Sequence, residues 1–276
     1  SVTIRRGADY IQGFYTARPQ KEIVPDISDT IAEQMRMLNM HRPNIKVARY
    51  YTVKDGRNEK LDIEKMLSER YTGVIVESAS VHLTANGCDN ATFVIKTENG
   101  SKCRIILDNV NIKSGMRQCI QIGENSDATI EIKGQNTLNY DGILVPDTAK
   151  LTITGDGSLY IDSYRNDGCC IGSSYNDTFG EITIDMTGSI EMQANGDHGI
   201  CIEMPIKLLG GSINMSSSGK DCIGVGSYDG SCGIETGNAI IDINCSGDNA
   251  VALGSLCGYV DIRINGTKLI LRALGI

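Results

Sequence analysis

LTITGDGSLYIDSYRNDGCCIG, residues 151–172, contains one complete unit of an internal repeat and decides the fold. Apolar residues alternate with polar ones over residues 151–154 and again over 158–162, and Gly, Asn and Asp separate these stretches. A five-residue frame, GCCIG at 168–172, closes the unit. Alternation with a period of two is typical of strands that bury one face. The unit therefore predicts three short strands joined by three turns.

The closing frame occurs six times in the second part of the chain, at intervals of 23 to 31 residues. Its copies are CIQIG (119–123), GILVP (142–146), GCCIG (168–172), GICIE (199–203), CIGVG (222–226) and AVALG (250–254). A repeat of this length with three strands matches one coil of a parallel β-helix, whose equivalent positions stack about 4.8 Å apart. A β-sandwich is the alternative, but sandwiches rarely confine their insertions to the same turns. The sequence predicts an all-β fold, a single-stranded right-handed parallel β-helix over residues 78–276.

Stacking the frames predicts which residues face the core. The second and fourth positions would form inward columns, with members Ile120, Ile143, Cys169, Ile200, Ile223, Val251 and Ile122, Val145, Ile171, Ile202, Val225, Leu253. Adjacent strand residues point to opposite faces, so Cys169 and Cys170 do not share a metal ion, and a disulfide between them would be strained. Cys170 and Cys201 would lie one coil apart in another column. We expect most of the ten cysteines to be free thiols, which favours folding in a reducing, cytoplasm-like compartment.

Composition narrows the classes of function. The 276 residues carry a net charge of −8 and a pI near 5.0, with Lys and Arg scattered, which argues against nucleic acid as a partner. No window reaches the roughly 18 to 20 consecutive apolar residues that a membrane span requires. The cysteines form no CxxC pair and the three histidines are far apart, so the spacing of a zinc ribbon is absent.

Residues 1–77 do not follow the repeat and are predicted to form a partly helical N-terminal segment. Apolar residues at helical spacing predict a helix over 26–42, and a second short helix is expected over 61–70. Such a segment would cap the open end of a β-helix or serve for attachment. The chain stops at KLILRALGI (268–276) with no comparable cap, which suggests trimming, a contact in a homo-oligomer, or a very short cap.

Four stretches, IILDNVNIKS (105–114), IEIKGQNTL (130–138), ILVPDTAKLTITGDGSLYI (143–161) and GEITIDMTGSI (180–190), carry a family resemblance. Over about residues 103–260 the chain resembles repeats of bacterial surface proteins described as carbohydrate-binding domain-containing β-helices, of the pectate-lyase-like fold class. The resemblance implies a polysaccharide or cell-surface glycan as the partner, adhesion as a role, and an extracellular, cell-surface or virion location. It brings no catalytic motif.

One polar column precedes the frame and reads Gln118, Asp141, Asp167, His198, Asp221 and Asn249. Stacked carboxylates repel one another unless a cation, a shared proton or solvent lies between them. Asp141, Asp167 and Asp221 are therefore candidate ligands of Ca²⁺, and no other cofactor is expected. The alternative is turn chemistry, because Asp and Asn before Gly favour left-handed and Asx turns.

Two tyrosines occupy equivalent turns after the frame. Tyr175 is followed by Asp177, and Tyr228 is followed by Asp229. Two coils separate these turns by roughly 9.6 Å, a disaccharide-scale distance, and tyrosine rings stack on sugar faces while their hydroxyls stay wet. These four residues are the candidate ligand-binding set, and the alternative is that they are ordinary exposed turn residues.

For catalysis, Asp167, His198 and Asp221 are the candidate residues, because RNDGCCIG (165–172) and GDHGICI (196–202) faintly resemble elements of polygalacturonases. An inverting glycosidase needs two carboxylates roughly 6.5 to 9.5 Å apart, which Asp167 and Asp221 would nearly satisfy. The constellation is incomplete, so the sequence favours a non-catalytic glycan-binding or adhesive module. A structural or phage-tail-like component and a polyuronate lyase or glycoside hydrolase are the alternatives.

Overall fold

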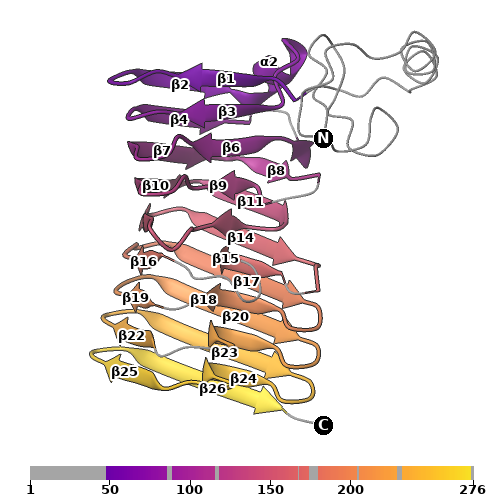
Figure 1. Cartoon of the computed structure of the whole chain (residues 1–276), viewed down its shortest axis with the longest axis vertical. Helices are drawn as coiled ribbons and strands as arrows, with labels where there is room; N and C mark the ends of the chain where they lie inside the picture. The colour runs from indigo at the N-terminus through magenta and orange to yellow at the C-terminus, as the bar shows by residue number, and fades with distance from the viewer. Residues whose placement is uncertain are drawn as a thin grey trace, which may run out of the picture. The chain divides into compact units, whose positions relative to one another are not determined.

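The computed structural model describes residues 48–85, 89–115, 118–166, 168–173, 180–203, 205–228 and 232–274. In the compact unit that begins at Ala48, strands stack side by side in three sheets, and each coil after the first contributes one strand to each sheet (Figure 1). Neighbouring strands of every sheet are parallel, as Tyr50↔Gly73 in the first pair and Ile240↔Lys268 in the last illustrate. The predicted all-β parallel β-helix is confirmed.

Among the described residues, the first sheet has nine strands in the order β1 (Tyr50–Val53), β3 (Gly73–Val76), β6 (Val94–Thr97), β9 (Ile120–Gln121), β12 (Ile143–Leu144), β15 (Cys169–Gly172), β18 (Ile200–Glu203), β21 (Ile223–Ser227) and β24 (Val251–Ser255). The second sheet, in the same part of the chain, has nine: β2 (Asn58–Asp62), β4 (Ser80–Thr84), β7 (Lys102–Asp108), β10 (Asp127–Lys133), β13 (Lys150–Gly155), β16 (Glu181–Ile184), β19 (Ile206–Leu208), β22 (Cys232–Thr236) and β25 (Val260–Ile264). The third has eight within these residues: β5 (Ala91–Thr92), β8 (Asn111–Lys113), β11 (Gln135–Tyr140), β14 (Ser158–Ser163), β17 (Ser189–Asn195), β20 (Ser212–Ser218), β23 (Ile240–Ser246) and β26 (Lys268–Leu274).

In the first coil a short helix, α2 (Ile63–Ser68), follows β2 in place of a strand of the third sheet. Asp62 caps it by accepting a hydrogen bond from the Lys65 backbone N–H at 3.1 Å, and Ile63 and Met66 are buried. This confirms the short helix predicted over 61–70, whereas the helix predicted over 26–42 lies outside the described residues. No helix in the described ranges has the length and apolar character needed to cross a bilayer.

The stack of coils includes residues upstream of position 78, where the repeat pattern suggested that the β-helix begins. Strand β1 already pairs with β3, and β2 with β4. The capping or attachment role proposed for the N-terminal segment concerns mainly residues 1–47, which lie outside the described ranges. The part of the N-terminal segment that is described therefore belongs to the β-helix itself.

The core is a set of aliphatic columns inside the coils. In the second sheet, Ile105, Ile130, Ile153 and Ile184 pair in succession, and each is fully buried. Burial of one such side chain contributes roughly 1.5–3 kcal/mol relative to exposure. Because the same position recurs in each coil, the period-two pattern read from the sequence translates directly into this continuous core.

The register of the first sheet differs from the stacked frames at one step. Ile120 pairs with Ile143 as expected, but Ile143 pairs with Ile171 and not with Cys169. The turn that leads into β12 holds only Asp141 and Gly142, whereas the four later turns at the same corner hold four or five residues. Because this turn is shorter, the frame at 142–146 pairs with the frame at 168–172 two residues out of the predicted register. Asp141 therefore does not lie in the polar column to which the sequence assigned it.

The inward assignment of the second frame position is wrong for four coils, because Val251 packs against the same small cluster as Cys169, Ile200 and Ile223. Cys169, Ile200 and Ile223 are buried in a separate small cluster on the outer side of the first sheet, whereas Cys170 and Cys201 belong to the main core. The fourth position does face the main core, as Ile171, Ile202 and Val225 show. The eight cysteines whose side chains are described are free thiols, as predicted: Cys103, Cys119, Cys169, Cys170, Cys201, Cys222, Cys245 and Cys257.

Candidate functional site

The turns that join the third sheet to the first form a corner of the coil, and three of them are built alike. His198, Asp221 and Asn249 occupy the left-handed backbone region there, with φ of 60°, 55° and 57°. The His198 N–H donates to the Lys220 carbonyl at 2.8 Å, which ties one turn to the next. Asp and Asn tolerate this conformation better than most residues. Turn chemistry, the alternative considered for the polar column, therefore accounts for Asp221 and Asn249.

A pocket of about 610 Å³ opens beside these turns, and we call it the corner pocket. It lies where the turns before β18, β21 and β24 meet the turns after β21 and β24. Its described lining residues are His198, Asp221, Tyr228, Asn249, Ala250, Val251, Leu256 and Cys257. Three of the residues singled out from the sequence, His198, Asp221 and Tyr228, thus come together in one pocket.

The Asp221 carboxylate is the polar centre of the corner pocket. Its Oδ1 accepts a hydrogen bond from Asn249 Nδ2 at 2.8 Å, and its Oδ2 lies 3.6 Å from His198 Nδ1. Lys220 Nζ is 4.0 Å from the same Oδ2. Carboxylate and amide groups held in this way can exchange hydrogen bonds with ligand hydroxyls.

Tyr228 supplies the aromatic wall of the pocket. Its ring packs against the outer cluster formed by Cys169, Ile200 and Ile223 and meets the His198 ring edge to face, with centroids 5.6 Å apart at 67°. The Tyr228 hydroxyl donates to the backbone carbonyl of Asp221 at 2.5 Å. This hydrogen bond and the packing against the outer cluster hold the Tyr228 ring in one orientation beside the Asp221 carboxylate.

Asp141 lies elsewhere, three coils from Asp221 and roughly 14 Å away along the stack. It is buried and accepts hydrogen bonds from Ser163 Oγ at 2.9 Å and from Arg165 Nη1 at 3.0 Å. Burial raises the pKa of the Asp141 carboxyl, and the bonds from Ser163 and Arg165 oppose the shift. The short turn before β12 is the reason that Asp141 is a structural ion-pair partner there and not a member of the outward column.

Four of the predicted site residues, Asp167, Tyr175, Asp177 and Asp229, lie outside the described residues, and their roles stay predictions. Within the described ranges, no group of three or more His, Cys, Asp or Glu side chains is arranged to hold a metal ion. The structure therefore does not bring Asp141 and Asp221 together as ligands of one Ca²⁺.

Leu256 and Cys257 are pocket residues that the sequence reading missed. Gly226 pairs with Gly254 and Ser227 with Ser255, so GSLCG (254–258) is the equivalent, one coil on, of GSYDG (226–230). Aligning these two turns would have placed Leu256 beside Tyr228. Asn249 was assigned to the polar column but given no role of its own.

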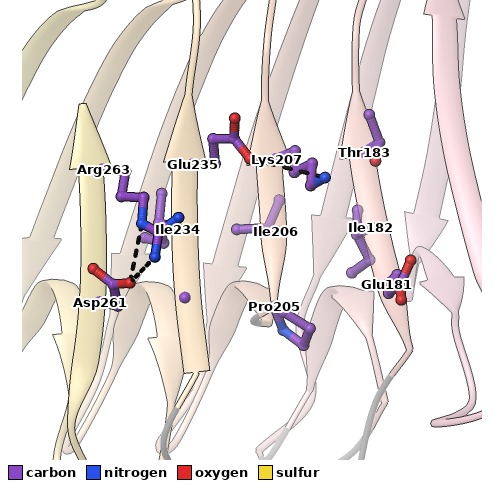
Figure 2. Close-up of a pocket in the computed structure, with 11 residues that line it drawn as sticks. Glu181, Ile182, Thr183, Pro205, Ile206, Lys207, Ile234, Glu235, Asp261 and Arg263 are labelled. Atoms are coloured by element: carbon purple, nitrogen blue, oxygen red, sulfur yellow. Dashed lines mark hydrogen bonds and ion pairs between the residues drawn. The ribbon is translucent and has the colours of Figure 1, made fainter. Parts of the chain in front are cut away.

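A second hollow, of about 400 Å³, lies on the outer face of the second sheet (Figure 2). Four of its five charged side chains pair with one another: Arg263 Nη2 donates to Asp261 Oδ2 at 2.8 Å, and Lys207 Nζ lies 3.8 Å from Glu235 Oε2. The fifth, Glu181, pairs with Lys150 outside the lining. Its described lining includes no aromatic residue. Internally paired charges on a flat sheet offer a sugar little, so the corner pocket is the better candidate.

Fold and pocket define a parallel β-solenoid with a pocket at one corner that aromatic and acidic side chains line. A family model, described as carbohydrate-binding domain-containing protein, matches residues 72–274, and the chain belongs to that family. The match spans the coils from β3 to β26 and includes every described residue of the corner pocket. Neither the curated proteins nor the solved structures contain a match to the chain.

Proposed function

We propose that the protein is a non-catalytic glycan-binding or adhesive module and that the corner pocket binds the sugar. The observation that carries the proposal is the meeting of Tyr228 and His198 rings with the Asp221 carboxylate and the Asn249 amide in one pocket. These are the groups that a sugar requires, because a pyranose has an apolar face and a rim of hydroxyls. The carbohydrate-binding family supports the same class of ligand.

Each wall of the pocket would contact a different part of the sugar. The Tyr228 ring would stack on the C–H face, with Val251 and Leu256 extending the apolar floor. Asp221 and Asn249 would exchange hydrogen bonds with adjacent hydroxyls. Because the Tyr228 hydroxyl is already bonded to the Asp221 carbonyl, the ring is ordered before the ligand arrives, which lowers the entropic cost of binding.

The number of carboxylates supports binding over hydrolysis. A glycosidase needs a pair of carboxyl groups on the two sides of the scissile bond. Among the described residues that line the pocket, Asp221 is the one carboxylate, and it is hydrogen-bonded to Asn249. Asp221 and His198 are residue types that can act as a catalytic acid and base. The experiment must therefore also test for turnover of the glycan.

The test is a glycan array with and without EDTA, followed by measurement of affinity for each glycan that binds. We expect Tyr228→Ala to weaken binding roughly tenfold, which corresponds to about 1.4 kcal/mol for a lost stacking contact. Tyr228→Phe keeps the ring but loses the bond to the Asp221 carbonyl, so it should bind more weakly than the wild type and more tightly than Tyr228→Ala. Tyr259→Ala is the matched control, because Tyr259 is 87% exposed and does not line the pocket.

A second measurement locates the glycan without mutation. Cys257 is an exposed thiol and lines the pocket, so a bound glycan should slow its reaction with iodoacetamide. Binding of no glycan would contradict the proposal and favour a structural or virion component. Release of reducing ends or unsaturated products, lost in His198→Ala or Asp167→Asn, would instead establish an enzyme. We expect EDTA to leave binding unchanged, and loss of binding would restore the Ca²⁺ hypothesis.

A further inference from the structure

We infer that the ligand is an extended polysaccharide chain that runs parallel to the stacking axis along the corner, held at its far end by a second site formed by Tyr140, Tyr164 and Asp162. The inference rests on the proposed function of the corner pocket. It adds a second binding site, a direction for the chain, and a minimum chain length.

Tyr140 and Tyr164 are two exposed aromatic residues on consecutive coils. Tyr140 ends β11 and Tyr164 follows β14, and their side chains are 51% and 58% exposed. Their ring centroids are 6.3 Å apart with an interplanar angle of 62°. Two rings at this angle form an exposed apolar surface that can contact one face and one edge of a sugar ring.

Asp162 lies two residues before Tyr164 in the chain and is incompletely satisfied. Asp162 is only 4% exposed, and its Oδ2 accepts a hydrogen bond from the Tyr160 hydroxyl at 3.4 Å. Its Oδ1 is buried and has no hydrogen-bond partner among the described residues. A buried acceptor without a donor is costly, and a ligand hydroxyl would satisfy it once the side chains that cover it move aside.

The tyrosine hydroxyls around Asp162 remain protonated over the ordinary pH range. A hydrogen bond to Asp162 raises the pKa of Tyr164, and burial together with the Asp162 charge raises the pKa of Tyr160 to about 12. The Tyr160 hydroxyl is therefore a donor to the carboxylate, and it helps to fix the position of Asp162. The site thus combines exposed rings with one preorganised acceptor, as the corner pocket does.

Both sites lie at the same corner of the coil, and a polar column connects them. Ser163 pairs with Ala194, so the next residue, Tyr164, is level with Asn195. Asn195 pairs with Ser218, and Ser218 with Ser246. The Ser218 hydroxyl hydrogen-bonds to Asn195 Oδ1 at 3.0 Å, and these side chains offer hydroxyl and amide groups along the path.

The spacing of the coils sets the length of the ligand. From the turn of Tyr164 to the turn of Asn249 there are three coil steps, which is roughly 14 Å, and Tyr140 adds one more step. One step is close to the length of one sugar residue in an extended chain. A disaccharide can therefore occupy one site at a time, whereas a chain of five or six sugars can occupy both. Joining two weak sites by one chain raises affinity through effective concentration.

The experiment measures affinity and stoichiometry by calorimetry for chito-, cello-, xylo- and galacturono-oligosaccharides from the disaccharide to the hexasaccharide. For the series that binds, we expect affinity to rise more than tenfold with length. The stoichiometry should fall from two disaccharides to one hexasaccharide per protein. Tyr164→Ala should abolish the gain with length and leave one disaccharide site, and Asp162→Asn should weaken the hexasaccharide selectively.

Tyr259→Ala serves again as the control, and far-UV circular dichroism with thermal unfolding confirms that each variant is folded. If Tyr164→Ala and Asp162→Asn both bind every oligosaccharide as the wild type does, the inference is overturned while the corner pocket stands. Failure of the wild type to bind any of these oligosaccharides or any arrayed glycan overturns the inference together with the proposed function. A constant stoichiometry of one at all lengths also counts against a second site.

Discussion

At the scale of single residues, Asp141 and Asp221 show how position changes the chemistry of one side-chain type. Both follow a strand of the third sheet, and both were assigned to one column from the sequence. Asp221 stays at the surface of the corner pocket with Asn249, while Asp141 is buried against Arg165 and Ser163. Two residues fewer in one turn are enough to separate a candidate binding group from a structural ion pair.

The Asp141–Arg165 pair leads to a prediction about stability and pH. Arg165→Met should lower the free energy of unfolding by roughly 1–3 kcal/mol at neutral pH, because it leaves a buried carboxylate without its charged donor. The pKa of Asp141 is already raised by burial above the usual 3.8, and the substitution should raise it further. Urea unfolding of both proteins across a pH series measures the effect.

The sign of the pH dependence follows from the raised pKa. A carboxyl whose pKa is higher in the folded protein favours folding when protonated, so its contribution is largest below pH 3.8 and is lost as the pH rises through the folded value. The stability difference between wild type and Arg165→Met should therefore shrink in acid. Adding Asp141→Asn to the Arg165→Met variant should remove most of the stability difference from the wild type. A difference that is equal at every pH would contradict this account of Asp141.

At the scale of elements, the corner turns are stacked through glycines. A Cβ on Gly219 would lie 2.5 Å from the Gly196 carbonyl oxygen, and a Cβ on Gly247 would lie 2.1 Å from that of Gly219. Gly219 and Gly247 also have φ of +129° and +135°, which side chains rarely allow. The turns that carry His198 and Asp221 can approach to one coil spacing only because these positions lack a side chain.

Gly219→Ala is accordingly predicted to destabilise the protein by about 3 kcal/mol, since it combines backbone strain with a clash against the neighbouring turn. Gly233→Ala is the matched control in a strand of the second sheet, where the nearest atom to an added Cβ is 3.5 Å away. We expect the control to change stability by no more than about 0.5 kcal/mol. Thermal unfolding compares the two, and equal melting temperatures would show that the turns tolerate a wider spacing.

At the scale of the whole described unit, each coil is stabilised chiefly by the coils beside it. The coils in the middle of the stack have neighbours on both sides, whereas among the described strands β25 pairs only with β22 and β26 only with β23. Apolar side chains of these last strands are exposed, among them Ile264 at 53% and Leu274 at 63%. In such quasi-one-dimensional folds, stability is a sum of local and neighbour terms.

We therefore expect amide hydrogen exchange to follow position in the stack. In the 276-residue chain, amides of β25 and β26 should exchange faster than those of β14 and β17, because among the described strands β25 and β26 have a partner on one side and β14 and β17 have partners on both. Mass spectrometry of peptic peptides after deuterium labelling resolves these strands. Equal protection in all four would mean that the end coil is covered in solution, for example by a second copy of the chain.

The sequence by itself determined the repeat, the parallel all-β fold, the short helix over 61–70 and the grouping of His198, Asp221 and Asn249 in equivalent turns. These features depend on alternation, period and turn residues, which are local properties of the chain and recur in each coil. They could be predicted because each coil repeats the same alternating strands and the same types of turn residue.

Only the tertiary structure decided the register step at Ile143 and Ile171, the burial of Asp141, and the faces on which Cys169 and Cys170 lie. It also brought Tyr228 onto His198, and Tyr140 beside Tyr164. Each of these depends on the length of a turn or on contacts between residues of different coils. The same alternating pattern fits two registers two residues apart, and the choice between them comes from how one coil packs on the next.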